Sequence, residues 1–327
     1  NSNDRPISQL AFLYVRRFMN ILFMGSPAFA APTLQAIARN QEHNVSVITQ
    51  PDKPAKRGYY QTPPIIKLMA QRLKLPVYQP FSLNTTEGIA LVKKLQPALI
   101  VVVAFGQILP DEILSIPPLG CINLHPSLLP KYRGAAPIQW SLINGDEKTG
   151  ITVAYITSKL DSGDIILQSE AGIENFDTGA SLSDKLSSSG AVLVMEAICL
   201  IKDGNASHIS QDETRASYAP KIKHYDALIN WQQPARNIFN LVRALNAAPG
   251  AYTLADSERL KILTTEIVDV GMSKEPGTVV DLARMGPIVS THDQGLLLLE
   301  VQPQAKKPMS GCQFLQGHKW KIGMRLR

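Results

Sequence analysis

NILFMGSPAFAAPTLQAIARNQEHNVSVIT, residues 20–49, is the stretch of sequence that decides the fold. Residues 20–24 are a short apolar run typical of a strand, and residues 43–49 alternate enough to form a second strand. Between them, Ser26 suits the N-cap of a helix and Pro27 its first turn, so a helix should run to about Arg39. A strand, a helix and a strand in this order predict the start of a parallel sheet.

The alternation of strands and helices continues to residue 204. Residues 98–104 (ALIVVVA) are apolar on both faces, as a central parallel strand is. The other expected strands cover residues 77–78, 121–125, 151–156 and 164–173, and the expected helices cover residues 65–73, 87–95 and 181–202. We therefore predict an α/β fold with a Rossmann-like, mostly parallel sheet.

The length of 327 residues suggests two domains, at roughly 100–200 residues each. We expect residues 1–18 to be a disordered leader, residues 19–204 one domain, the polar residues 205–219 a linker and residues 220–327 a second domain. The second domain begins with an expected helix at residues 235–244. Short β-like runs then follow at close intervals and predict a small barrel or sandwich. These runs cover residues 260–270, 277–282, 288–291 and 296–301.

Basic charge is concentrated in the second domain. Of a net charge of +6, residues 220–327 account for +5. Such a domain can attract a polyanion, and RNA or DNA is the usual candidate. On composition alone, a solvated basic face without a partner remains the alternative.

Composition argues against several classes of protein. Apolar residues make up 45% of the chain and charged residues 18%, an ordinary globular balance. No apolar run approaches the roughly 18–20 residues that span a bilayer, so we expect no membrane association. Cys121, Cys199 and Cys312 form no C-x-x-C pair, which argues against a disulfide framework or a zinc–thiolate site and fits a reducing cytosol.

Several cofactor motifs are absent from the sequence. The first turn is G-S-P-A-F at residues 25–29 rather than G-x-G-x-x-G, which argues against NAD or FAD. Neither a P-loop nor the G-x-S-x-G of α/β-hydrolases occurs. The six histidines show no H-E-x-x-H or H-x-E spacing, so we expect no catalytic metal.

Asn123 and His125 lie where an expected strand ends. Because side chains alternate along a strand, both project to one face while Leu124 points to the core. At the carboxyl edge of a parallel sheet that face opens into the ligand crevice. An amide beside an imidazole can hold the oxyanion that forms when a nucleophile adds to a carbonyl, and Asp161 in the loop KLDSGD can orient the imidazole. Taken singly, each of these residues is more often structural.

Residues 50–64 form a long, proline-rich loop that carries Lys53, Lys56 and Arg57. Connections from a strand to a helix usually have about 2–6 residues. Long loops inside compact domains are more often functional than not. We therefore expect this basic loop to take part in function.

Residues 123–134, NLHPSLLPKYRG, resemble the signature of the folate-dependent formyltransferases, which joins N-x-H, S-L-L-P and a later aspartate. Within that family the chain is similar to the members that act on methionyl-tRNA. The similarity includes residues 21–30, 49–58 and 103–110, and it covers about residues 19–324. Two positions depart from the usual pattern: Pro126 stands where small residues also occur, and residues 157–159 replace an acidic, glycine-containing run.

The resemblance implies an activity and a set of site residues. The implied reaction transfers a formyl group from 10-formyltetrahydrofolate to the α-amino group of initiator methionyl-tRNA, for use in translation initiation. The catalytic residues of the family fall on Asn123, His125 and Asp161. Its folate-binding residues fall on Ser127, Leu128, Leu129, Pro130, Val103, Phe105, Gly106, Ile108 and Leu109.

The resemblance also implies contacts with tRNA. The arginine of the family's tRNA-sensing loop falls on Arg57, and we expect Lys53 and Lys56 to meet the acceptor end with it. Lys306 and Lys307 are candidate phosphate contacts in the second domain, which the resemblance implies is an OB-like β-barrel. We expect a cytoplasmic monomer that uses folate as co-substrate and needs no metal.

Three other functions are compatible with the sequence. A formyltransferase that acts on an amino sugar nucleotide would share the same catalytic residues and folate pocket, although the basic loop and basic second domain favour tRNA. A hydrolase that releases formate from the same folate would need no large basic domain. A non-enzymatic RNA-binding protein would have no chemical need for Asn123, His125 and Asp161 together.

Overall fold

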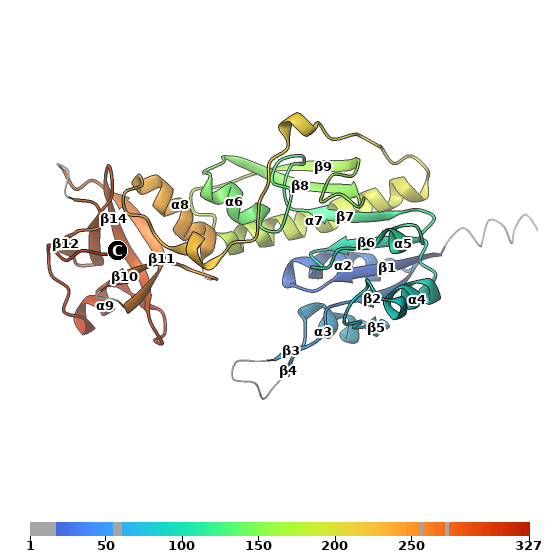
Figure 1. Ribbon diagram of the computed structural model, residues 1–327, viewed down its shortest axis with the longest axis horizontal. Helices are drawn as coiled ribbons and strands as arrows, with labels where there is room; N and C mark the ends of the chain where they lie inside the picture. Colours follow the sequence, from blue (N-terminus) through green and yellow to red (C-terminus); the bar gives the residue numbers. More distant parts are fainter. Residues whose placement is uncertain (1–17, 55–60, 247, 256–257, 272–274) are drawn as a thin grey trace, which may run out of the picture. The chain divides into compact units, whose positions relative to one another are not determined.

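The computed structural model describes residues 18–54, 61–246, 248–255, 258–271 and 275–327 (Figure 1). The chain divides into two compact units. Unit 1 holds the described residues up to Arg133 with Gly150–Ala171 and Asp184–Ser217, and unit 2 holds Gly134–Thr149, Gly172–Ser183 and Tyr218–Arg327. The expected leader falls almost entirely outside the described residues. The domain bounds given by the sequence stay a prediction.

A seven-stranded sheet forms the centre of unit 1, in the order β5-β2-β1-β6-β7-β8-β9. The strands are β1 (Met19–Gly25), β2 (His43–Ile48), β5 (Val77–Tyr78), β6 (Leu99–Val103), β7 (Cys121–His125), β8 (Lys148–Tyr155) and β9 (Ile165–Gly172). The first five run parallel, and β8 pairs antiparallel with β7. From β1 the chain builds outward to β2 and β5, then crosses to β6 on the other side. This arrangement confirms the predicted mostly parallel α/β sheet.

Helices cover both faces of this sheet. They are η1 (Ala28–Ala30), α2 (Ala31–Arg39), α3 (Ile65–Arg72), α4 (Thr86–Leu95), α5 (Asp111–Leu114) and the long α7 (Gly179–Lys202). On one face, Leu22 and Ile100 belong to a core cluster with Val92 of α4 and Ile113 of α5. On the other face, α7 passes so close to β7 that a Cβ on Gly190 would lie 2.6 Å from Leu124.

The expected start of the first helix is wrong. Ser26 does not cap it: the turn begins with η1, whose N-cap is Pro27, and α2 follows from Ala31. Ser26 Oγ instead accepts hydrogen bonds from Gln50 N (3.1 Å) and Thr49 Oγ1 (3.2 Å). The hydroxyl therefore ties the end of β1 to the end of β2, a partner that lies too far along the chain for local capping rules to identify.

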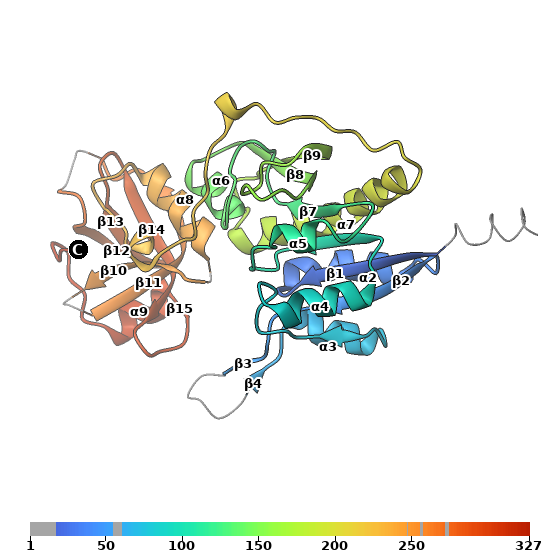
Figure 2. The ribbon, with the colours of Figure 1, turned by 45° about the vertical axis from the view of Figure 1, so that its right-hand side comes forward.

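Unit 2 is built on antiparallel strands in the order β10-β11-β14-β13-β12, with β15 paired to β14 (Figure 2). The strands are β10 (Ala251–Ala255), β11 (Glu258–Val268), β12 (Val279–Ala283), β13 (Gly286–Ser290), β14 (Gly295–Pro303) and β15 (Met309–Ser310). Helices α6 (Pro137–Ile143), α8 (Ala235–Leu245) and α9 (Gly311–Gly317) accompany them, with a short turn η3 (His224–Ala227). Trp231, Ile238, Leu296 and Phe314 lie in its core. The sequence missed β10, β15, α6 and α9.

Among the helices of the described residues, none is both long and apolar enough to cross a membrane.

Helix α8 takes its cap from a distant residue. Pro234, which precedes the helix, has no side-chain oxygen to offer. Asp293 Oδ1 accepts from Ala235 N at 2.8 Å and from Thr291 Oγ1 at 3.1 Å. The hydrogen bond from Ala235 is the main reason that the pKa of Asp293 lies below its ordinary value.

We expect Asp293→Ala to lower the free energy of unfolding by about 1 kcal/mol at neutral pH, the usual cost of a lost helix cap. Because the pKa of Asp293 is depressed in the folded chain, its contribution is present above the ordinary value of 3.8 and is lost as the pH falls through the folded pKa. Urea unfolding of both proteins at neutral and acidic pH measures this, and the difference should shrink in acid. Asp293→Asn, which keeps an acceptor oxygen, should cost less. An equal difference at both pH values would contradict the cap.

Candidate functional site

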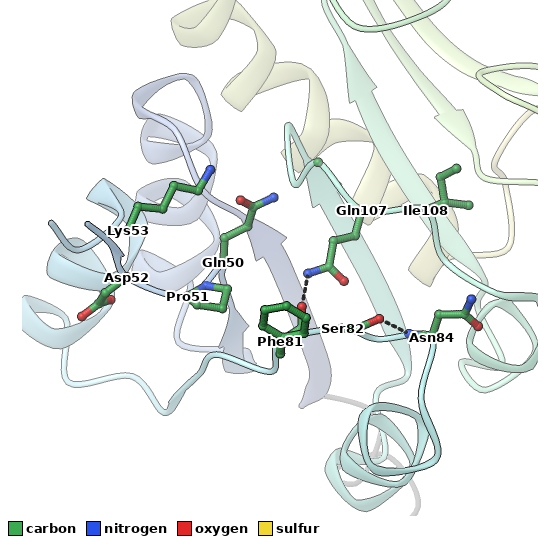
Figure 3. A pocket seen from close by; sticks show the side chains of 10 residues that line it. Gln50, Pro51, Asp52, Lys53, Phe81, Ser82, Asn84, Gln107 and Ile108 are labelled. Atoms are coloured by element: carbon green, nitrogen blue, oxygen red, sulfur yellow. Dashed lines mark hydrogen bonds between the residues drawn. The ribbon is translucent and has the colours of Figure 1, made fainter. Parts of the chain in front are cut away.

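A pocket opens at the carboxyl edge of the parallel sheet, with a volume of about 710 Å³ (Figure 3). Three loops line it, each following a parallel strand: residues 50–53 after β2, residues 81–84 after β5 and residues 106–108 after β6. Figure 3 shows the ring of Phe81 and the amides of Gln50 and Gln107 around it. Ligands of open α/β sheets bind outside the carboxyl ends of the strands, where the strand order reverses. This pocket lies at that edge.

Strand β7 brings Asn123 and His125 to the same edge. The register pairs Asn123 with Val102 of β6, so Asn123 and Val102 lie on the same face of the sheet. His125 lies two residues on and therefore faces the same way, whereas Leu124 is buried on the opposite face. In the described part of the chain the partly exposed Asn123 amide has no hydrogen-bond partner. That amide is available to a ligand.

The imidazole of His125 is held from both sides. Its side chain is 4% exposed, and Nε2 lies 2.9 Å from Tyr132 O. A carbonyl oxygen can only accept, so Nε2 carries the proton of this hydrogen bond. Nδ1 faces the Asp161 carboxylate, with Oδ2 at 3.8 Å. In the neutral ring Nδ1 therefore carries the lone pair, on the side of the ring that faces the Asp161 carboxylate.

Asp161 reaches this position through a tight loop between β8 and β9. Its φ is +47°, in the left-handed region that aspartate tolerates better than most residues. Gly163 packs directly on the end of β8: a Cβ there would lie 1.8 Å from Tyr155 O. The D-S-G order thus has a structural reason, because the loop must turn sharply and pass close to the backbone of β8.

The segment Ser127–Pro130 is fixed by Thr152 of β8. Thr152 Oγ1 donates to Ser127 O (2.6 Å) and accepts from Leu129 N (3.1 Å) and from Gln168 Nε2 (2.8 Å). Ser127 and Leu129 are buried, whereas Leu128 and Pro130 are half-buried. The segment is therefore a rigid wall that packs against β8 and β9.

The residues predicted to bind folate separate into three groups. Gly106 and Ile108 line the pocket, and Ile108 is 85% exposed. Val103, Phe105 and Leu109 are buried beneath it. The lining found among the described residues does not include Ser127, Leu128, Leu129 or Pro130. Seven lining residues were not named as site residues from the sequence: Gln50, Pro51, Asp52, Phe81, Ser82, Asn84 and Gln107. All of them except Pro51 are polar or aromatic residues that follow the end of a strand, which is the signal that could have identified them.

The root of the basic loop is anchored beside the pocket. Asp52 accepts from Gln79 Nε2 (2.7 Å) and from Lys67 Nζ (2.7 and 2.9 Å). The hydrogen bond from Gln79, followed by that from Lys67, holds the pKa of Asp52 below its ordinary value, so this carboxylate is ionised at neutral pH. Lys53 is exposed and lines the pocket in the two-residue strand β3 (Lys53–Pro54), which pairs with β4 (Gln61–Thr62).

The other basic residues predicted to contact tRNA are not all described. Lys56 and Arg57 lie outside the described residues. Lys306 and Lys307 are exposed in the turn between β14 and β15 of unit 2. Their surface position is compatible with a phosphate contact.

The described residues offer neither a cluster of metal ligands nor, in Cys121, a reactive thiol. In the part of the chain that the structure describes, no group of three His, Cys, Asp or Glu side chains could hold a metal ion. Cys121 shares β7 with Asn123, but burial raises its pKa to about 12. At neutral pH it remains a thiol and is a poor nucleophile.

Two family models match most of the chain. The model described as Formyl transferase matches residues 19–198, and the model described as Formyl transferase, C-terminal domain, matches residues 221–319.

Curated relatives match nearly end to end. The methionyl-tRNA formyltransferase of Desulforamulus reducens is 43% identical over 306 residues, which is 93% of this chain and 96% of that protein. The protein of the same name from Bacillus subtilis is 44% identical over 91% of this chain and 94% of its own length. That from Clostridioides difficile is 44% identical over 94% of this chain and 100% of its own length.

Solved structures share the fold. The N-formyltransferase from Helicobacter canadensis, in complex with folinic acid and dTDP-3-aminofucose, gives a TM-score of 0.65 at 19% identity and covers 87% of this chain and 99% of that one. HypX from Aquifex aeolicus in complex with tetrahydrofolic acid gives 0.62 at 18% identity, over 91% of this chain and 47% of that one. The resemblance carried by residues 123–134 is thus confirmed. The chain belongs to the formyl transferase family, as a relative of the methionyl-tRNA formyltransferases.

Proposed function

We propose that the chain transfers a formyl group from 10-formyltetrahydrofolate to the α-amino group of initiator methionyl-tRNA. The observation that carries this proposal is the meeting of three side chains at the carboxyl edge of the sheet. Asn123 and His125 share a face of β7, and the Asp161 carboxylate lies 3.8 Å from His125 Nδ1. The names of relatives at 42–44% identity support the choice of acceptor.

Each of the three side chains has a distinct role in the proposed reaction. The Asn123 amide donates a hydrogen bond to the formyl oxygen, on which negative charge develops when the amine attacks. His125 Nδ1 takes up the proton that the amine loses as its nitrogen bonds to the formyl carbon, while Nε2 stays hydrogen-bonded to Tyr132 O. The same proton then passes to N10 of the folate as the bond between the formyl carbon and N10 breaks, and tetrahydrofolate leaves. Asp161 stabilises the positive charge that then arises on the ring.

The residues at this edge fit a folate, which would supply the formyl group. A pterin has a flat face and an edge of hydrogen-bonding groups. Phe81, 91% exposed, offers an aromatic ring, and Gln50 and Gln107 offer amide donors and acceptors in the same pocket. We propose that Gly106 and Ile108 contact the folate directly, with Leu128 and Leu129 as a wall of its site. Val103, Phe105 and Leu109 support the pocket from below.

The basic residues are proposed to hold the tRNA. Lys53, Lys56 and Arg57 would meet its acceptor end, and Lys306 and Lys307 its phosphates. We further propose a cytoplasmic monomer that works without a metal.

The direct test is to incubate the protein with methionyl-tRNA and 10-formyltetrahydrofolate and to look for formylmethionine. A dTDP-amino sugar in place of the tRNA, and the folate without any acceptor, are the parallel reactions. Formylmethionine from the initiator tRNA supports the proposal. Formylation of the sugar, or release of formate without an acceptor, would replace it by one of the other two activities.

Asn123→Ala should lower kcat by roughly 10²–10³, because one oxyanion donor is lost, while the affinity for tRNA stays nearly unchanged. Steady-state kinetics and filter binding measure the two quantities. Asn20→Ala is the matched control, since that amide is exposed at the amino end of β1. A near-normal kcat in Asn123→Ala would remove the role given to this residue.

Thr152→Val should raise the KM for the folate about tenfold, a change of ~1.4 kcal/mol, because the loop at residues 127–130 must then be ordered on binding. The change removes all three hydrogen bonds of the hydroxyl at nearly constant volume. Thr152→Ser keeps the hydroxyl and should restore most of the affinity. If valine and serine gave the same KM, the loop would not depend on Thr152.

Replacing Lys306 and Lys307 together by glutamine should reduce the slope of log K against log salt for tRNA binding by about two, one for each lost phosphate contact. Binding measured between low and moderate salt gives the slope. The control is Lys93→Gln with Lys94→Gln, at the exposed end of α4, which removes the same amount of charge. Equal slopes for both pairs would exclude specific contacts at Lys306 and Lys307.

A further inference from the structure

Residues 209–217, expected to be part of a linker, form hydrogen bonds with the loops that contain Asp161 and Tyr132. Ile209 and Ile165 exchange backbone hydrogen bonds of 2.8 and 3.1 Å at the edge of the sheet. Further along, Ser217 Oγ accepts from Tyr132 N at 2.9 Å, next to the carbonyl that binds His125. The segment therefore contacts the strand that follows the Asp161 loop and also the loop that contains Tyr132.

Gln211 uses its whole side-chain amide in this arrangement. Nε2 donates to Asp161 O at 2.9 Å and to Gly163 O at 2.8 Å. Oε1 accepts from Arg133 Nε at 3.1 Å and from Arg133 Nη2 at 2.7 Å. A guanidinium only donates and a backbone carbonyl only accepts, so these partners leave one orientation for the amide.

Arg133 gives this amide a fixed anchor. Its side chain is 2% exposed. Besides Gln211, it binds both carboxylate oxygens of Glu213, at 2.8 and 2.9 Å. The hydrogen bond from Arg133 is the main reason that the pKa of Glu213 lies below its ordinary value. A planar guanidinium held in this two-pronged way has little freedom to move, so Gln211 is held too.

The Asp161 loop is a place where such support matters. Its backbone is left-handed at Asp161, and Gly163 passes against the backbone of β8. Gln211 binds the carbonyls of these two residues, on either side of Ser162. Fixing both carbonyls fixes the direction of the intervening backbone, and with it the direction of the Asp161 carboxylate toward His125.

We propose that Gln211, held by Arg133, is a positioning residue that aims the Asp161 carboxylate at His125. The inference rests on the proposed function, in which Asp161 acts on the imidazole. In the proposed role, Gln211 contacts neither the substrate nor the reacting atoms. Its effect is on turnover through Asp161, because a carboxylate displaced by about 1 Å loses much of its effect.

Gln211→Ala should lower kcat by roughly 10- to 100-fold and leave the KM values for folate and methionyl-tRNA within about threefold. Gln211→Glu provides a second variant: its carboxylate keeps the pairing with Arg133, which preserves the fold, but has no N–H for the two carbonyls. It should lose as much turnover as Gln211→Ala. Asp212→Asn, whose side chain binds its neighbour Thr214, is the matched control and should change kcat by less than about twofold.

A double-mutant cycle with Asp161→Asn distinguishes positioning from general weakening of the fold. If Gln211 acts through Asp161, Gln211→Ala should cost little in a protein that already carries Asp161→Asn. Thermal melting of all four proteins checks that they are folded at the assay temperature.

Three outcomes would overturn the positioning role of Gln211, and the first of them would also overturn the catalytic role of Asp161. Full turnover in Asp161→Asn alone would overturn the catalytic role of Asp161, and the positioning role with it. A second outcome is that Asp161→Asn loses turnover while Gln211→Ala and Gln211→Glu keep normal turnover. This outcome would overturn the positioning role and leave the proposed function intact. If Gln211→Ala lowered kcat by the same factor with Asp161 and with Asn at position 161, the positioning role would also be overturned.

Discussion

The alternation of side chains along β7 is the constraint on which the site depends. Leu124 is buried against α7, where Gly190 allows a close approach. With Leu124 fixed on that face, Asn123 and His125 must project from the other one. A shift of one residue in the pairing of β7 with β6 would turn the amide and the imidazole toward α7 and the leucine toward the site. The packing of one apolar residue thus sets the direction of two functional ones.

The loops around β7 owe their shape to hydrogen bonds from the neighbouring strand β8 and from residues 209–217. Thr152 on the antiparallel strand β8 fixes the segment after His125, and Gln211 fixes the loop that carries Asp161. In each case one side chain satisfies several backbone groups that would otherwise be buried without partners. Loops built in this way can hold reacting groups as rigidly as a strand does, which is what stabilising a developing charge requires.

Much of the fold could be predicted because its signals are local. The apolar runs of β1 and β6 and the spacing of α7 were recognisable in the sequence, as was the strand end at His125. The errors came from residues whose partners are distant. Ser26 has the chemistry of a helix cap, yet its hydroxyl binds the end of β2. Gln211 lies in a polar stretch typical of a linker, yet it contacts the proposed catalytic loop.

The sequence by itself determined the α/β class, the common face of Asn123 and His125, and the family resemblance carried by residues 123–134. Those features follow from patterns that extend over a few neighbouring residues. Such patterns can be recognised without knowledge of the rest of the chain. Tertiary structure decided which residues line the pocket and which side chain holds the Asp161 loop in place. Asp161 and Gln211 stand 50 positions apart, and such pairs meet through strand order and loop closure, which no local pattern encodes.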